Sequence, residues 1–315
     1  MLFAVCIAVC IAAAMPALRA QQSAPATPAA AASQAAAPVP PGVELVHDNL
    51  VYGLADGQTL LLDVYEPPDS TGAPRPAVIL LHGGGWTSFD KSTMHPLARF
   101  LALSGFVTVT VDYRLYHDNA NRWPAQLDDV QRAVRWVRAN AAKYNVDPEH
   151  IGAYGHSAGA QLALLLGMVE TRDNSDAALA KYSSKVEAVV EASGPTDLTA
   201  EHDAPNAKFL ADFLGADYET HPEVWRDASP VWHAAKSNAP ILIIHGTRDQ
   251  MVPVAQAAEL DAALVKAGAD VKFLQLESDH TFQEPAARRE LAMGTLAFFN
   301  QYLRGAGPNT STPTP

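Results

Sequence analysis

The chain has 315 residues and a formal net charge of −12. Its 22 lysines and arginines form no long basic run, so neither nucleic acid nor an anionic membrane surface is an expected partner. Cys6 and Cys10 are the only cysteines and both lie near the N-terminus, which leaves the remainder without a disulfide, a thiolate nucleophile or a cysteine metal site.

Residues 1–42 lack the pattern of a folded domain. Residues 2–18 are uncharged and mostly apolar, and small residues surround a cleavage point after Ala20. We therefore expect residues 1–20 to be a secretory signal peptide, although no basic residue precedes its apolar core. Residues 21–42 are rich in Ala, Pro and Gln without charge, which predicts a disordered linker. We therefore expect a secreted or periplasmic protein that has no stable membrane association after the signal peptide is removed.

Residues 43–304 are expected to form one α/β domain, and residues 305–315 a flexible tail. From about residue 75 onward apolar runs alternate with helical patterns, which is typical of a mostly parallel sheet with helices on both faces. We expect strands at residues 60–65, 77–82, 106–112, 151–154, 186–192, 241–245 and 271–276. We expect helices at residues 94–103, 124–144, 158–169, 254–267 and 284–303.

The first motif with chemical meaning is His-Gly-Gly-Gly-Trp at residues 82–86, directly after an expected strand. Glycines there let backbone N–H groups approach a substrate oxygen, and acyl transfer needs such donors for its tetrahedral oxyanion. We expect Gly83 and Gly84 to be two of these donors. A phosphate-binding loop is the alternative, but no Walker lysine follows and G-x-G-x-x-G spacing is absent.

The second motif is Gly-His-Ser-Ala-Gly at residues 155–159, between an expected strand and an expected helix. In that context a G-x-S-x-G sequence predicts a nucleophile elbow, which holds the serine exposed on a tight turn. Ser157 is therefore the candidate nucleophile and the Ala158 amide the third oxyanion donor. Trp86, Phe89 and His156 are candidate substrate-binding residues, with core packing as the alternative reading.

The two motifs together resemble the α/β-hydrolase superfamily, in its H-G-G-G carboxylesterase and lipase branch. Members similar to hormone-sensitive lipase, feruloyl esterases and kynurenine formamidase are the most alike, over about residues 43–303. The Asp-Tyr-Arg-Leu run at residues 112–115 matches many relatives, whereas Tyr-His-Asp at 116–118 departs from the usual Ala-Pro-Glu. The resemblance implies an α/β-hydrolase fold and no cofactor or metal.

An insertion at residues 197–237 separates two expected strands and is longer than an ordinary loop. It carries aromatic residues without one clean helical period. We expect either helical packing over the sheet edge or a cap that supplies an apolar wall to the site.

The resemblance implies the order nucleophile, acid, histidine along the chain. Asp249 ends a short loop after the expected strand at 241–245 and is the candidate acid, with Asp197 as its rival. His280 lies in a polar loop between the last strand and the last helix, where a general base is expected. Asp279 beside it is expected to face elsewhere. His82 and His156 form no metal-binding pair, and an H-E-x-x-H motif is absent.

These residues predict a secreted serine carboxylesterase that hydrolyses short-chain or aromatic carboxylic esters through an acyl-enzyme on Ser157. The expected partner is therefore a small-molecule ester. One alternative is an exported amidase or peptidase of the same fold, similar to formamidases or prolyl oligopeptidase. Another is a non-catalytic binding protein, although all three triad residues are present.

Overall fold

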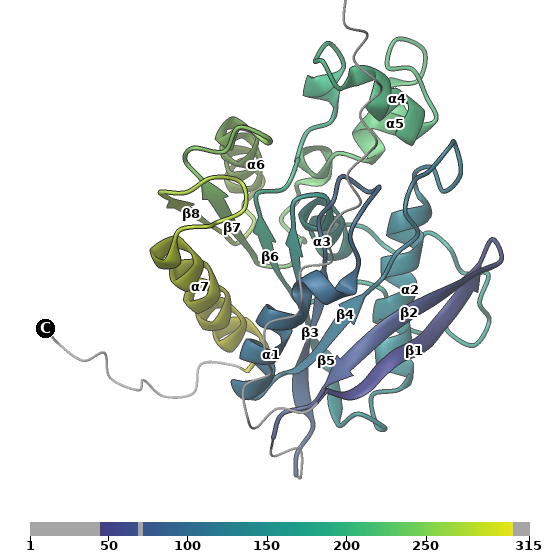
Figure 1. Cartoon of the computed structure of the whole chain (residues 1–315), viewed down its shortest axis with the longest axis vertical. Helices are drawn as coiled ribbons and strands as arrows, with labels where there is room; N and C mark the ends of the chain where they lie inside the picture. The colour runs from purple at the N-terminus through teal and green to yellow at the C-terminus, as the bar shows by residue number, and fades with distance from the viewer. Residues whose placement is uncertain (1–44, 69–71, 305–315) are drawn as a thin grey trace, which may run out of the picture. The chain divides into compact units, whose positions relative to one another are not determined.

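A computed structural model of the protein describes residues 45–68 and 72–304 (Figure 1). The expected signal peptide, linker and C-terminal tail all lie outside these described residues. One eight-stranded sheet organises the described chain, in the order β1-β2-β4-β3-β5-β6-β7-β8. The strands β1 and β2 are antiparallel to each other, β2 is antiparallel to β4, and all other neighbours are parallel. The mostly parallel sheet of an α/β-hydrolase fold is thus confirmed.

The helices and strands follow the expected alternation closely. The strands are β1 (Leu45–Ala55), β2 (Gln58–Tyr65), β3 (Arg75–Leu81), β4 (Val107–Val111), β5 (Val146–His156), β6 (Ala188–Ala192), β7 (Ile241–Gly246) and β8 (Val271–Leu276). The helices are α1 (His95–Leu103), α2 (Ala125–Ala139), α3 (Ala158–Met168), α4 (Ala207–Leu214), α5 (Pro222–Asp227), α6 (Val254–Ala267) and α7 (Pro285–Leu303). Short 3-10 turns lie at Lys91–Met94 (η1), Thr199–Glu201 (η2) and Pro230–His233 (η3).

The sequence analysis missed β1. This strand pairs with β2 through a two-residue turn at Asp56 and Gly57, with Ala55 opposite Gln58. Both turn residues have positive φ, +48° and +75°, the conformation that a tight hairpin with right-handed twist requires. The Asp-Gly pair was the available signal for this hairpin. The expected helix at 124–144 is also shorter than predicted, since α2 ends at Ala139.

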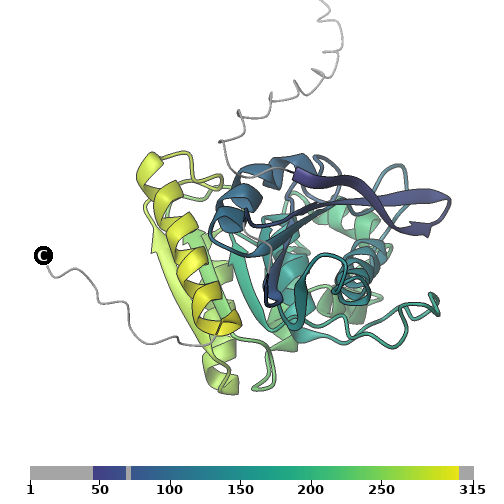
Figure 2. The same cartoon turned by 90° about the horizontal axis from the view of Figure 1, so that it is seen from below.

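Helices lie on both sides of the sheet (Figure 2), and two layers of apolar side chains hold them to it. One face packs against α2, α3 and α6, and the other against α1 and α7. Every residue of α3 is buried, because this helix lies between the sheet and its neighbours. Every residue of β4 and β6 is buried, as expected for strands covered on both faces, although β4 alternates valine with threonine and β6 contains one glutamate.

The insertion at 197–237 folds into η2, α4, α5 and η3, and α4 and α5 lie beyond the carboxyl ends of the strands (Figure 1). Phe213 and Trp225 are buried within it, at 0% and 1% exposure. Phe209 and Leu210 of α4 instead line a cavity that contains Ser157. The segment therefore both packs on the domain and supplies an apolar wall. Within the described ranges, no helix is long and apolar enough to span a membrane.

Candidate active site

Ser157 occupies a sharp turn between β5 and α3. Its backbone has φ +55° and ψ −124°, a conformation that non-glycine residues rarely adopt. A Cβ at Gly155 would lie 2.1 Å from the Gly159 carbonyl oxygen, and one at Gly159 would lie 2.3 Å from the His82 carbonyl oxygen. Glycine is therefore required at both positions so that the turn can close against the end of β3.

The structure brings Ser157, His280 and Asp249 into one hydrogen-bonded line. His280 Nε2 lies 2.9 Å from Ser157 Oγ, and His280 Nδ1 lies 2.7 Å from Asp249 Oδ2. The histidine comes from the loop after β8 and the acid from the loop after β7, so both reach the elbow from neighbouring strand ends. Asp197, the rival acid, instead accepts hydrogen bonds from the Thr199 amide and hydroxyl.

Hydrogen bonds hold Asp249 as a carboxylate. Its Oδ1 accepts from the amides of Met251 and Val252 at 2.8 and 2.9 Å. Burial alone would raise the pKa of Asp249, but hydrogen bonds from His245, His280 and the Val252 amide lower this pKa well below its usual range. A carboxylate fixed in this way can hold one tautomer of His280, with Nδ1 protonated and Nε2 free to accept the Ser157 proton.

The glycine loop packs directly on the elbow. A Cβ at Gly83 would lie 3.1 Å from Ser157 Cβ, and one at Gly84, where φ is +107°, would lie 2.1 Å from the Ser88 carbonyl oxygen. Gly84 therefore cannot be replaced without moving the loop. As the first residue of α3, Ala158 has no intrahelical acceptor for its amide. The three expected oxyanion donors thus lie on segments that meet at Ser157.

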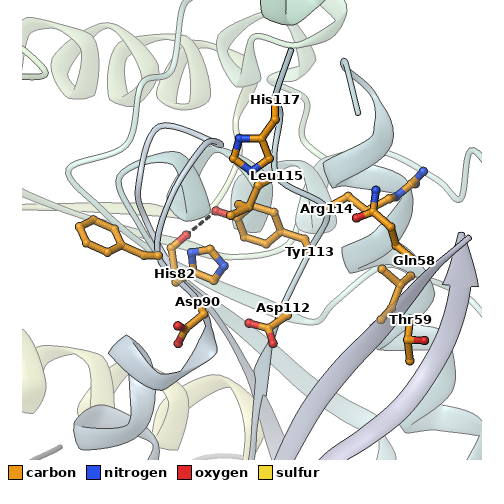
Figure 3. A pocket seen from close by; sticks show the side chains of 11 residues that line it. Gln58, Thr59, His82, Asp90, Asp112, Tyr113, Arg114, Leu115 and His117 are labelled. Atoms are coloured by element: carbon orange, nitrogen blue, oxygen red, sulfur yellow. Dashed lines mark hydrogen bonds between the residues drawn. The ribbon is translucent and has the colours of Figure 1, made fainter. Parts of the chain in front are cut away.

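Tyr113 fixes which way the loop's peptide groups point. Its hydroxyl donates to the carbonyl of His82 at 2.8 Å, as Figure 3 shows, and lies 3.4 Å from the carbonyl of Gly83. The imidazole of His82 stacks on the Tyr113 ring, with its Nδ1 2.7 Å from the Gly83 carbonyl. In a trans peptide the N–H points opposite to the C=O, so the amides of Gly83 and Gly84 are turned away from Tyr113.

We predict that Tyr113→Phe lowers kcat about tenfold, equivalent to losing one buried hydrogen bond of about 1.4 kcal/mol. The ring and its stacking on His82 remain, so the effect isolates the hydroxyl. Steady-state kinetics on a p-nitrophenyl ester measures it. Tyr116→Phe is the matched control, because within the described ranges the Tyr116 hydroxyl has one hydrogen-bond partner, the exposed Asn119 side chain at 3.4 Å. Equal kcat in both variants would contradict the orienting role.

The candidate substrate-binding residues lie in three different places. Trp86 lines the cavity at Ser157, stacks on Phe213 with 4.6 Å between ring centroids, and donates from Nε1 to Gln161. Phe89 is 61% exposed and lines a separate cavity of about 250 Å³ together with His82 and Tyr113. His156 Nε2 lies 2.9 Å from the backbone carbonyl of His280, outside the lining of the Ser157 cavity. Burial lowers the pKa of His156 to about 4, so it is neutral near pH 7.

The cavity at Ser157 has a volume of about 280 Å³. Its walls combine apolar side chains, including Trp86, Phe209 and Leu210, with polar ones at Glu201 and Asn206. Met251, on the loop that carries Asp249, stands at the rim and is 73% exposed. The cavity can therefore take a small apolar group next to the serine and a more polar group beside Glu201.

Besides Tyr113, two further functional positions escaped the sequence analysis. Gln161 links Trp86 to the insertion, since its Nε2 donates to the Ala228 carbonyl at 2.7 Å. Gln256 of α6 binds the amides of Thr196 and Asp197 and the carboxylate of Glu201, which anchors the start of the insertion. Polar residues on otherwise apolar helix faces were the only signal. Among residues 45–68 and 72–304, no cluster of His, Cys, Asp or Glu could hold a metal ion.

The sheet order, the elbow and the glycine loop define an α/β-hydrolase of the H-G-G-G carboxylesterase and lipase branch. Within that class, the chain belongs to the BD-FAE family, which matches residues 62–264.

Curated relatives and solved structures agree with this placement. The chain is 35% identical to the esterase LipC of Mycobacterium tuberculosis over 66% of its own length and 52% of LipC. It is 33% identical to LipQ of the same organism, over 74% of this chain and 56% of LipQ. The chain thus spans about half the length of these relatives. The butyrate-bound esterase Est2 of Thermogutta terrifontis superposes with a TM-score of 0.72 at 27% identity, covering 85% of this chain and 97% of Est2.

Proposed function

We propose that the protein is a serine carboxylesterase. The observation that carries this proposal is the line from Ser157 Oγ through His280 to Asp249, with contacts of 2.9 and 2.7 Å, in which the serine and the histidine line a cavity. The esterase names of the relatives and of Est2 support the reaction class, because these proteins are similar to this chain in sequence or in fold.

The reaction proceeds in two halves. His280 Nε2 takes the Ser157 proton as Oγ attacks the ester carbonyl, and the amides of Gly83, Gly84 and Ala158 stabilise the oxyanion that forms. Collapse of this intermediate breaks the bond to the alcohol, which leaves with the proton from His280. Water, activated by the same imidazole, then hydrolyses the acyl-enzyme and restores the serine. Asp249 stabilises the imidazolium in both halves.

We further propose short-chain or aromatic esters as substrates. A cavity of about 280 Å³ suits a small acyl group or a single ring rather than a long fatty chain, and Trp86 and Phe209 give it flat apolar walls. Est2 has been solved with propionate and with butyrate bound, which supports a small acyl group for this fold. Glu201 and Asn206 favour a polar alcohol portion. Export through the signal peptide at residues 1–20 completes the proposal.

A substrate panel with covalent labelling tests the proposal. Hydrolysis of p-nitrophenyl acetate, butyrate, octanoate and palmitate is compared with that of a methyl hydroxycinnamate and an aryl formamide. We expect kcat/KM to fall steeply beyond octanoate. Paraoxon should inactivate the protein with one diethylphosphoryl group on Ser157, as intact mass and peptide mapping would show. Faster turnover of the formamide would favour the amidase, and absence of labelling would favour a binding protein.

A further inference from the structure

The cavity beside Ser157 has an unbalanced charge. Among the described residues that line it there is no lysine or arginine, and Glu201 is the one carboxylate. His280, the other titratable residue of the lining, must be neutral to take the Ser157 proton. The lining of the cavity therefore carries one formal negative charge and no positive charge to offset it.

The Glu201 carboxylate is held in place without being neutralised. It ends η2 and is partly buried, and its Oε1 accepts from Gln256 Nε2 at 3.1 Å. The Gln256 amide is itself fixed, because it also binds the backbone of Thr196 and Asp197. Within the described ranges, Glu201 Oε2 has no hydrogen-bond partner, and it remains accessible rather than buried. This oxygen is thus available to a group inside the cavity.

The charges around the cavity have the same sign as Glu201. Asp249, which binds His280 from behind, is held as a carboxylate by its hydrogen bonds. The chain as a whole has a formal net charge of −12. Apolar walls such as those of this cavity focus an electrostatic potential, because they keep out the water that would weaken it. A positively charged group is therefore favoured in the cavity, and a negatively charged one is disfavoured.

Glu201 lies on the acid–base side of the cavity. Gln256, which holds it, belongs to α6, and α6 follows the loop that carries Asp249. Met251 of this loop also lines the cavity. Asp249 binds His280, which passes its proton to the leaving alcohol. The alcohol portion of a bound ester is therefore the part that extends toward Glu201.

We propose that Glu201 selects esters whose alcohol portion carries a positive charge, with small quaternary ammonium alcohols as the class that fits. Trp86 and Phe209 line the same cavity, and aromatic rings attract quaternary ammonium groups through their negative faces. Glu201 takes no part in proton transfer and is a specificity-determining residue. This inference rests on the proposed esterase function.

Two acetate esters of nearly equal shape test the proposal. One is acetylcholine, and the other is its uncharged analogue, in which a tert-butyl group replaces the trimethylammonium group. The readout is the ratio of their kcat/KM values, measured on the full chain at low salt. We expect Glu201→Gln to lower this ratio about tenfold, through the loss of one attractive charge close to the ammonium group. Comparing the ratio between proteins cancels the difference in chemical reactivity between the two esters.

An anionic ester and a matched variant complete the experiment. Acetoxybutanoate, whose alcohol portion ends in a carboxylate, should be the poorest of the three substrates and should improve in Glu201→Gln. Glu223→Gln is the control, because Glu223 lies on α5 of the same insertion, is exposed and pairs with His221. It removes the same charge from a position outside the cavity lining, so it should leave all the ratios unchanged.

An equal ratio in the unmodified protein and in Glu201→Gln would overturn the proposal, as would an equal fall in Glu223→Gln. If Glu201→Gln does not fold, the salt dependence of the unmodified protein provides the test. The preference for acetylcholine should weaken as salt screens the charge, and a ratio that does not change with salt would contradict the role of Glu201. An active esterase without any charge preference would refute this inference alone, whereas inactivity on every ester, p-nitrophenyl acetate included, would refute the esterase proposal as well.

Discussion

Ser157→Ala is expected to lower kcat on p-nitrophenyl acetate by about 10⁶-fold, the scale seen when a serine nucleophile is removed. His280 and Asp249 stay in place, but no atom at the elbow can attack the carbonyl. The oxyanion donors and the cavity persist, so a small residual rate above that of water is expected. KM for the remaining activity should change little, because the alanine removes no cavity wall.

Labelling and folding controls make this result specific. Paraoxon should no longer add a diethylphosphoryl group to the Ser157→Ala protein. The substitution is not expected to change stability, since alanine is as strained as serine at φ +55°. Ser104→Ala is the matched control, because the Ser104 hydroxyl donates to the Phe100 carbonyl at the end of α1, on a different segment from the elbow. Retained ester hydrolysis in Ser157→Ala would contradict the nucleophile assignment.

The sequence predicted the parts of the site that depend on local context. The glycine loop follows β3, Ser157 follows β5, Asp249 follows β7 and His280 follows β8. The carboxyl ends of parallel strands meet at one edge of the sheet, so residues placed just after them are brought together by the topology. The structure gives the distances among them, while their catalytic roles remain predictions for the experiments above.

Positions that act across strands could not be predicted in the same way. Tyr113 follows β4, and it reaches the glycine loop because Val111 pairs in register with Leu81 on β3. Neither the strand order nor this register can be predicted from the sequence of β3 or of β4 alone.

The insertion shows a different limit. Its aromatic residues indicated both core packing and a cap, and α4 does both, because Phe213 faces inward while Phe209 lines the cavity. The spacing of apolar residues in one short helix does not predict which part of the protein each face of the helix packs against. The size of substrate that fits therefore depends on the insertion, whose sequence has no clean period. The reaction depends on loops that directly follow regular strands.

Asp249→Asn is expected to lower kcat by about 10⁴-fold, through a reversal of the His280 tautomer. The amides of Met251 and Val252 both donate to Asp249 Oδ1, so the asparagine oxygen should take that place. Its NH₂ group then faces His280 Nδ1, which must become an acceptor. The proton moves to Nε2, 2.9 Å from Ser157 Oγ, and His280 can no longer act as a base.

The pH dependence of stability gives an independent check on Asp249. A carboxyl group whose pKa is lowered in the folded state contributes stability above its unfolded pKa of about 4, and this contribution is lost as pH falls below that value. Asp249→Asn should therefore lower the thermal midpoint more at pH 7 than at pH 3. For kcat, Asp279→Asn is the control, because Asp279 lies next to His280 and accepts hydrogen bonds from the Thr281 amide and hydroxyl. If Asp279→Asn lowered kcat as much as Asp249→Asn does, the assignment of Asp249 as the triad acid would be contradicted.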